Sequence, residues 1–212
     1  QDRRTGRQDV VDDRVVGRLE LRSLLGREGN HAVAVEHGPN RHPRRLLQEH
    51  DAGAVERDHP SQAVEQGHEH GLAVIVDVVY NHFGPGDLSL WQFDGWSEND
   101  KGGIYFYNDR RSNTPWGETR PDYGRGEVRQ YLRNNALMWF EEYHVDGLRF
   151  DSTLYLRTID GEEDNSLPEA WSLMQQINSE IRARFPRSIT IAEDLQNNAS
   201  ITKPLADNGA GF

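Results

Sequence analysis

The sequence predicts an α/β fold with a parallel sheet for residues 68–212, and two observations carry this prediction. Strand-like apolar runs alternate there with helix-like segments in the order strand, long loop, helix, strand, helix, strand. Such alternation is typical of parallel strands joined by right-handed crossovers. An acidic residue also stands at or near the carboxyl end of each strand, where β/α enzymes assemble their sites. Residues 1–67 show neither feature, so the N-terminal third is expected to be irregular.

The three predicted strands are short apolar runs that end at polar residues. Residues 72–79 are almost continuously apolar, as expected of a strand that is covered on both faces. Residues 148–151 follow an Asp-Gly turn, and residues 188–193 follow shortly after Pro186. We expect the carboxyl ends of all three strands to lie at one edge of the sheet.

Two amphipathic helices are predicted between these strands. Residues 127–143 carry apolar side chains at intervals of three or four, which indicates one buried face. The second helix opens at Ser166 and Glu169 with a capping box and an early Pro168, and it stops before Pro186. Its apolar stripe consists of Trp171, Met174, Ile177, Ile181 and Phe185.

Residues 80–125 are predicted to form a long loop subdomain. Connections in compact domains usually have about 4 to 6 residues, and much longer loops are usually functional or disordered. Eight aromatic residues argue against disorder, and we expect most of them to form a small core within the loop. They are Trp91, Phe93, Trp96, Tyr105, Phe106, Tyr107, Trp116 and Tyr123.

The composition of residues 1–67 differs from that of the rest of the chain. All 19 aromatic residues occur at Tyr80 or later, whereas seven of the nine histidines precede it. Three interpretations are open: a disordered arm, an unfamiliar domain, or a stretch that is not in the natural reading frame of the gene. The third explains most, because a GC-rich gene read out of frame favours Arg, His, Val, Gly, Ala and Asp over aromatic residues.

Charge and composition exclude several classes of function. The formal charge is −11, which disfavours nucleic acid or an anionic membrane as a partner. The absence of cysteine excludes disulfides, thiolate metal sites and a cysteine nucleophile. The longest apolar run, residues 72–76, is far shorter than the roughly 20 residues that span a bilayer. No signal-like apolar run follows Gln1, so we expect a cytoplasmic protein.

The polar residues at the predicted strand ends suggest a reaction. Asp77, Asp151 and Glu193 should converge, and Arg149 shares a strand face with Asp151. Cleavage of a glycosidic bond needs one ionised carboxylate to attack and one protonated carboxylic acid to donate. Arg149 favours Asp151 as the nucleophile, and Glu193, with no adjacent cation in sequence, suits the acid. Alternatively, each carboxylate only accepts hydrogen bonds from loop amides.

Three separated motifs resemble a known family. The segments Asp77–His82, Gly147–Asp151 and Ala192–Asp194 look like the first three conserved regions of the α-amylase family of glycoside hydrolases and transglycosidases, in the correct order. The resemblance covers about residues 68–212. It implies a partial (β/α)8 barrel that contains about strands three to five, with the long loop after strand three.

Other segments narrow the resemblance within the family. Residues 123–129, 141–147 and 114–117 look most like glycogen branching enzymes and maltooligosyltrehalose trehalohydrolases. The implied function is that of a retaining enzyme that cleaves α-1,4-glucosidic bonds of a glucan or maltooligosaccharide, most similar to a branching-type transglycosylase. An α-amylase-type or trehalohydrolase-like hydrolase is the alternative.

The resemblance also implies roles for single residues. Asp151 would be the nucleophile and Glu193 the general acid/base, while Arg149 would hold Asp151 ionised and oriented. Asp77 and His82 would bind the sugar at the cleaved bond.

Further candidates follow from the same resemblance. Tyr80 counts as a substrate-binding residue, and Trp91, Trp96 and Trp116 are candidates for stacking on sugar rings. Asn81 matches a position that ligates calcium in many amylases, although a structural Asn is the favoured interpretation. No cofactor is expected otherwise.

Two function classes compete with this assignment. A metal-dependent hydrolase would use Asp77, His82 and Asp87 as ligands, and a noncatalytic remnant would bind carbohydrate through the aromatic residues. The family's fourth conserved region and strands six to eight are not recognisable before Phe212. We therefore expect this chain to be an incomplete, inactive part of an active enzyme.

Overall fold

A computed structural model describes residues 17–19, 31–36, 60–84 and 90–212. Asp87 and most of residues 1–59 lie outside the described residues. The proposed reading-frame error and the disordered arm concern that part of the chain and stay predictions.

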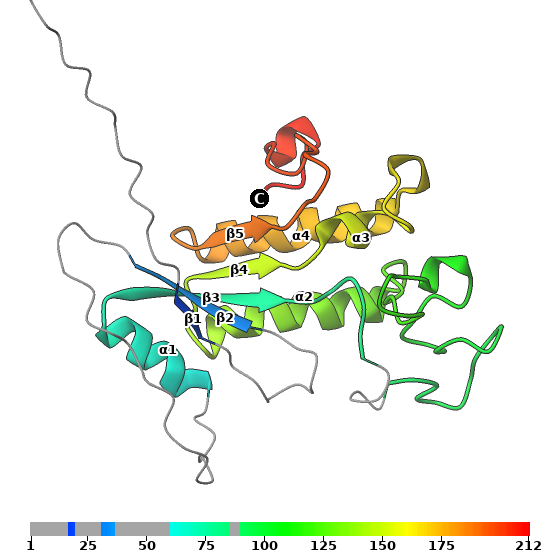
Figure 1. Cartoon of the computed structure of the whole chain (residues 1–212), viewed down its shortest axis with the longest axis horizontal. Helices are drawn as coiled ribbons and strands as arrows, with labels where there is room; N and C mark the ends of the chain where they lie inside the picture. The colour runs from blue at the N-terminus through cyan, green and yellow to red at the C-terminus, as the bar shows by residue number, and fades with distance from the viewer. Residues whose placement is uncertain (1–16, 20–30, 37–59, 85–89) are drawn as a thin grey trace, which may run out of the picture.

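The described part contains one five-stranded sheet in the order β1 to β5 (Figure 1). Strands β3, β4 and β5 are parallel, which confirms the predicted parallel sheet, whereas β1 and β2 join it in antiparallel pairs. The strands are β1 (Gly17–Leu19), β2 (His31–Glu36), β3 (Leu72–Val78), β4 (Gly147–Phe150) and β5 (Ile189–Ala192).

Two long helices, α2 (Gly126–Glu141) and α4 (Pro168–Arg184), cross over between the parallel strands. Both lie on the same face of β3, β4 and β5, and they contact each other (Figure 1). The predicted strands and helices agree with the observed ones to within about two residues. Among the described helices, none has the length and apolarity that crossing a membrane requires.

The core lies between these helices and the sheet. Val76, Leu148 and Phe150 point to this face and are at most 2% exposed. They pack in one cluster with Leu132 of α2 and Met174 of α4. The alternate residues of the strands point to the opposite face, as the two-residue period of a strand requires.

The expectation that residues 1–67 are irregular is wrong for β1, β2 and the start of α1 (Pro60–Glu69). Val64 of α1 is buried, and a side chain at Gly67 would meet Val74 of β3 at 2.7 Å. Tertiary contact with β3, rather than a local pattern, therefore stabilises α1. The antiparallel pairing of β2 with β3 also departs from a (β/α)8 barrel, in which all strands are parallel.

The start of α4 differs from the prediction as well. Its N-cap is Leu167, without a side-chain cap, so the capping box of Ser166 and Glu169 does not form. Ser166 instead pairs with Thr158 in a β-bridge, and Glu169 accepts a hydrogen bond from the hydroxyl of Tyr107 at 3.1 Å. The backbone of Ser166 and the side chain of Glu169 are thus each engaged by a tertiary partner.

The short helix α3 (Thr153–Arg157) follows β4 directly and was not predicted. A five-residue helix offers too few turns for a periodic apolar pattern to be recognised. Three further single-turn 3-10 helices lie at Arg110–Ser112, Glu163–Asn165 and Leu205–Asp207.

Candidate active site

The parallel register brings the predicted site residues to one edge of the sheet. Asp77 of β3 is directly opposite Arg149 of β4, and Arg149 is opposite Ile191 of β5. Asp151 and Glu193 stand two residues further along β4 and β5, so all of these side chains share one sheet face. This is the face that α2 and α4 leave uncovered.

A single guanidinium joins the three carboxylates. Arg149 forms an ion pair with Asp77 through Nη1, and its Nη2 lies 2.6 Å from Oε1 of Glu193. The Nη1 atom is also 3.9 Å from Oδ1 of Asp151. The structure thus brings together the four residues that the sequence placed at the strand ends.

Glu193 has no adjacent cation in the sequence, but it has one in the folded structure. Arg149 is remote from Glu193 in sequence, but β4 and β5 are adjacent in the sheet, and the two side chains form an ion pair. Of the two candidate catalytic carboxylates, Glu193 has the closer contact with Arg149.

Asn81 holds Asp151 from the β3 side. Its Nδ2 donates to the carbonyl oxygen and to Oδ2 of Asp151, each at 2.9 Å, and its side chain is fully buried. Its Oδ1 contacts Nδ1 of His82. Both ends of this amide are engaged within the protein, which supports the structural interpretation of Asn81.

Glu193 is held by the residues that follow Asp151. The backbone amide of Ser152 donates to Oε2 of Glu193 at 3.0 Å. The amide and the hydroxyl of Thr153 both donate to the carbonyl oxygen of Glu193 at 2.9 Å. Ser152 has a left-handed backbone with φ of 43°. Ser152 and Thr153, which directly follow Asp151 at the end of β4, therefore hold Glu193 at the end of β5.

An aromatic wall flanks the carboxylates. The indole of Trp116 stacks on His82 with a ring separation of 4.8 Å and an angle of 10°, and Tyr155 packs edge-on against it at 5.4 Å. Trp116 is 47% exposed. Among the contacts that the structure describes, Trp116 is the candidate stacking residue that packs against a predicted site residue, His82.

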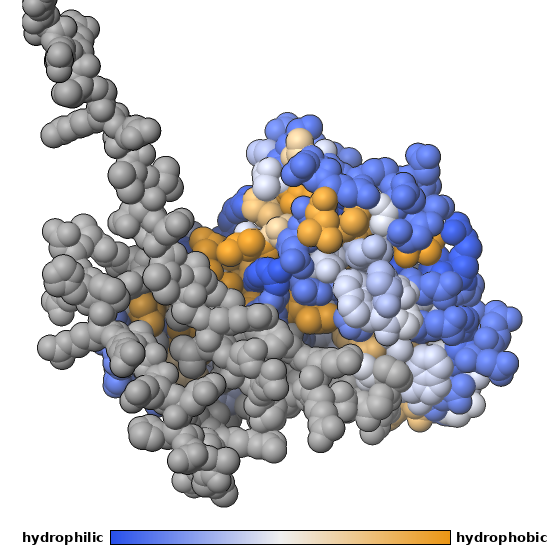
Figure 2. Space-filling view, viewed as in Figure 1, coloured by the Kyte–Doolittle hydropathy of each residue, from blue (hydrophilic) through white to orange (hydrophobic). Residues whose placement is uncertain are grey.

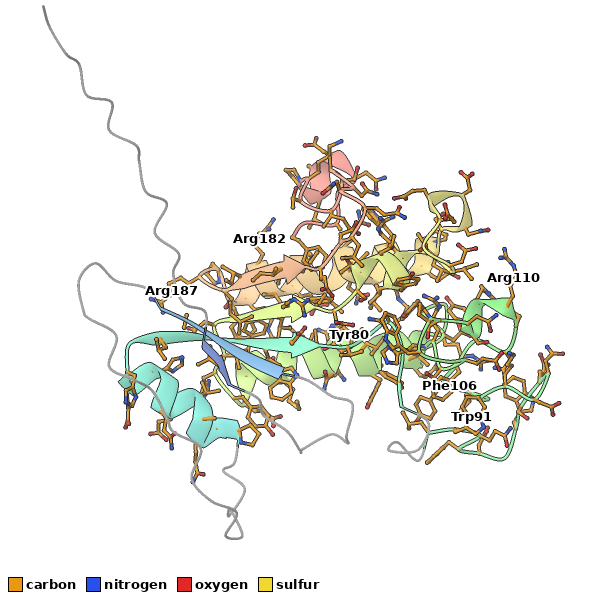
Figure 3. The ribbon with its side chains drawn as sticks, in the orientation of Figure 1. Tyr80, Trp91, Phe106, Arg110, Arg182 and Arg187 are labelled. Atoms are coloured by element: carbon orange, nitrogen blue, oxygen red, sulfur yellow. The ribbon has the colours of Figure 1, made fainter. Side chains whose placement is uncertain are left out.

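The other two candidate stacking residues, Trp91 and Trp96, have their contacts within the loop. Trp91 packs on Phe106 at 5.6 Å, and Figure 3 shows both on the loop, away from Tyr80 near the strand ends. Trp96 lies beneath the guanidinium of Arg125 at 5.3 Å. Trp91 is thus packed on an aromatic ring of the loop, and the guanidinium of Arg125 lies over the ring of Trp96.

Tyr80 points into the core, contrary to its prediction as a substrate-binding residue. Its ring is buried edge-on against Phe150, and its hydroxyl donates to Oδ1 of Asn135 at 2.8 Å. Burial raises the pKa of Tyr80 well above its usual value. The residue after Val79 faces the helices, because strand side chains alternate between the two faces.

The loop is anchored by a residue that the sequence did not single out. Arg120 is fully buried, and its guanidinium donates at 2.7 Å to the carbonyl oxygens of Arg111, Asn113 and Ile159. Burial lowers the pKa of Arg120. A buried arginine bound only to carbonyls gives no recognisable sequence pattern. The prediction that most loop aromatics form a core of the loop's own is wrong: Tyr107 and Tyr123 belong to the main hydrophobic core, and Phe93, Trp96 and Trp116 are exposed.

The metal hypothesis loses two of its ligands to other contacts. Asp77 pairs with Arg149, and His82 contacts Asn81 and Trp116. Asp87 lies outside the described residues. Within the described ranges, no group of three or more histidine or acidic side chains is arranged to hold a metal ion.

Comparison with known proteins identifies the relatives of this chain. The 1,4-alpha-glucan branching enzyme GlgB of Pseudoalteromonas atlantica is 37% identical over 164 residues, which cover 70% of this chain and 21% of the relative. The branching enzyme GlgB of Kitasatospora aureofaciens is 38% identical over 162 residues, with 70% and 20% covered. Over 70% of its length, this chain is therefore similar to 1,4-alpha-glucan branching enzymes, in agreement with the resemblance to the α-amylase family.

Two further comparisons complete the list of similarities. A Salmonella typhimurium protein provisionally named an alpha amylase superposes with a TM-score of 0.48 at 28% identity, over 65% of this chain and 20% of the other. No family model matches the chain. The chain spans about one fifth of the length of the curated branching enzymes that it matches.

Proposed function

We propose that this chain carries the nucleophile and the acid/base of a retaining enzyme that acts on α-1,4-glucans, most similar to a branching-type transglycosylase. The observation that supports it is the gathering of Asp77, Asp151 and Glu193 around Arg149 at the carboxyl ends of three adjacent parallel strands. Resemblance to the α-amylase family and similarity to branching enzymes support the same reaction.

In the first step, Asp151 attacks the anomeric carbon of a glucosyl residue while Glu193 donates a proton to the departing glycosidic oxygen. The bond between carbon and that oxygen breaks, and a covalent glucosyl ester forms on Asp151. Asn81 and Arg149 keep the Asp151 carboxylate ionised and oriented. Contacts with the sugar replace the pairing of Glu193 with Arg149, so that Glu193 can carry its proton.

In the second step, Glu193 acts as the base. It takes a proton from a hydroxyl of an acceptor, whose oxygen attacks the anomeric carbon and releases Asp151. A sugar acceptor gives a transferred glucan chain, and water gives hydrolysis. Trp116 and His82 offer an open aromatic wall on which a sugar ring can stack. These steps use no cofactor.

A fluorosugar with a fluoride leaving group tests this proposal on the 212-residue chain. Fluoride leaves without protonation, and the fluorine on the sugar ring slows release of the ester, so the reagent should accumulate on Asp151, located by peptide mass mapping. Asp151→Asn should abolish the label. The exposed Glu142, at the C-cap of α2, supplies a matched control, since Glu142→Gln removes a carboxylate at the end of the helix that lies near the start of β3.

Each outcome separates the competing functions. Binding of a maltooligosaccharide without labelling of Asp151 would favour a noncatalytic remnant. A label on another residue, or neither binding nor labelling in a protease-resistant chain, would overturn the proposal. Faster release of the label by a maltooligosaccharide than by water would favour transglycosylation over hydrolysis.

The proposal includes two further expectations. The partner is an α-1,4-glucan or maltooligosaccharide rather than nucleic acid or a membrane, because the net charge of −11 repels phosphate groups. The cytoplasmic location and the incomplete, inactive nature of the isolated chain stay predictions. The labelling assay does not require complete turnover, so it is informative even for such a chain.

A further inference from the structure

We infer that Arg157 is a positioning residue for Glu193, and that a clamp between α3 and the end of β5 fixes the two candidate catalytic carboxylates relative to each other. This inference deepens the proposed function and rests on it for the role of Glu193. The α3–β5 clamp is defined by the side chains of Thr153, Arg157, Glu163 and Asp194.

The centre of the clamp is a buried ion pair. Nε and Nη2 of Arg157 donate to the two carboxylate oxygens of Asp194 at 2.8 and 3.2 Å. The exposed fractions of the two side chains are 3% and 7%. A bidentate pair of this kind fixes both position and orientation. Asp194 directly follows Glu193 in the chain, so fixing Asp194 restrains the backbone that carries the acid/base.

The clamp also contacts Glu193 directly, through Thr153. Thr153 donates to the carbonyl oxygen of Glu193 and, at 3.3 Å, to Oδ2 of Asp194. Thr153 begins α3 and Arg157 ends it. One short helix, starting two residues after Asp151, therefore contacts Glu193 and the residue that follows it.

Neighbouring contacts extend the clamp along the loop that follows β5. Nη1 of Arg157 also pairs with Glu163 at 2.7 Å. The side chain of Gln196 donates to the carbonyl oxygen of Gly161 at 2.6 Å, and that of Asn198 donates to Glu163 at 3.3 Å. Residues 194–198 thus lie against the segment that follows α3.

The sheet offers β5 support on one side only within the described residues. Ile189 and Ile191 of β5 are 46% and 39% exposed, whereas β4 is paired on both sides. A strand at an edge is more easily deformed than one with two partners. The restraint on Glu193 must therefore come from β4 and from the clamp, and Arg157 is the clamp's most extensively bonded side chain.

The electrostatics of Asp194 agree with a permanent pair. Burial would raise the pKa of Asp194, but hydrogen bonds from Arg157 and the amide of Gln196 outweigh it, and the pKa is lowered. The folded structure therefore favours the ionised form of Asp194.

Hydrogen exchange in the 212-residue chain tests the positioning role without any substrate. Arg157→Met should accelerate exchange at the amides of Ser152 and Thr153, which donate to Glu193, by about tenfold or more. The amide of Leu148 in β4 should not change. Arg157→Lys should restore part of the protection. Arg133→Met, which removes the remote ion pair of Arg133 with Glu180, is the matched control.

A second variant keeps the inference testable if Arg157→Met does not fold. Asp194→Asn keeps the side-chain volume and removes the other charge of the same ion pair, so it should produce the same local acceleration. Unchanged protection of Ser152 and Thr153 in a folded Arg157→Met or Asp194→Asn chain would overturn the inference. Acceleration at every amide would also count against it, because that result describes general destabilisation.

A chemical measurement separates positioning from a merely structural role. Labelling of Asp151 by the activated fluorosugar needs little help from an acid, so its rate in Arg157→Met should stay within about threefold of the unsubstituted chain. Release of the label to a sugar acceptor needs Glu193 as a base and should slow by about tenfold or more. An equal loss in both steps would contradict positioning. If the unsubstituted chain is not labelled, the proposed function fails, whereas the exchange result still decides the clamp.

Discussion

The two faces of the parallel sheet differ in what covers them. On the helix side, Val76, Leu148 and Phe150 are at most 2% exposed beneath α2 and α4. On the other side lie Asp77, Arg149 and the half-exposed Ile191 (Figure 1). Figure 2 shows apolar side chains open to solvent in the region of β5. One strand pattern thus supplies both a packed core and an open face for chemistry.

The difference shows where stability and function are separated. Stabilisation comes from apolar area removed from water, and that area is concentrated on the helix side. On the other face, Arg149, Asp151 and Glu193 are partly exposed, whereas Asp77 beside them is buried. Substitutions on the two faces of the sheet test this separation of stability and function directly.

The largest effect is expected in the core. Leu148→Ala removes a fully buried side chain and should lower the free energy of unfolding by about 2–5 kcal/mol. Ile191→Ala, on the open face, should cost less than about 1 kcal/mol. Urea denaturation followed by circular dichroism measures both. Similar costs at the two positions would contradict the separation of the faces.

The clamp should make stability depend on acid. The pKa of Asp194 is lowered in the folded chain, so its contribution is fully present above the ordinary value of 3.8 and is lost as the pH falls through the lowered pKa. Asp194→Asn should cost about 2 kcal/mol at neutral pH.

The same substitution should flatten the decline of stability below about pH 4. Unfolding curves between pH 7 and about pH 2.5 provide the measurement. Parallel pH profiles for the two chains would show that Asp194 is not stabilised by its pair.

The aromatic wall should affect binding more than stability. Trp116→Ala should weaken binding of a maltooligosaccharide by about tenfold, because an indole face is lost beside His82. Phe93 is 63% exposed on the loop, and Phe93→Ala is the control, with little expected change. Affinity electrophoresis in gels that contain glucan compares the two variants. Equal retardation of both would remove Trp116 from the site.

The smallest effect on stability is expected from a charge placed on the open face. Ile191→Lys should change the free energy of unfolding by no more than about 0.5 kcal/mol. It should nevertheless raise the concentration at which the chain aggregates, because a charged strand edge disfavours pairing between molecules. Light scattering at increasing concentration tests this. A large loss of stability would show that Ile191 is packed in solution.

The sequence predicted much of the region from β3 to β5. The apolar runs and the three- or four-residue periods identified the parallel strands, α2 and α4, because those patterns reflect local geometry and one-sided burial. The convergence of Asp77, Arg149, Asp151 and Glu193 followed from parallel topology alone.

Other features depend on contacts between distant segments. The antiparallel strands β1 and β2 and the helix α1 are stabilised by β3, and their own sequences show no clear pattern. Tyr80 turns into the core because Asn135 and Phe150 offer it partners there. Arg120 binds carbonyls of three separate residues, an arrangement that no local motif predicts.

The sequence by itself determined the order of strands and helices, the residues at the strand ends and the family that they resemble. Only the tertiary structure decided the pairing of those residues. Arg149 contacts Glu193 more closely than Asp151, and Arg157 binds Asp194. The physical reason is that a periodic pattern fixes the direction of a side chain, whereas its charged partner depends on which strands and helices become neighbours in space.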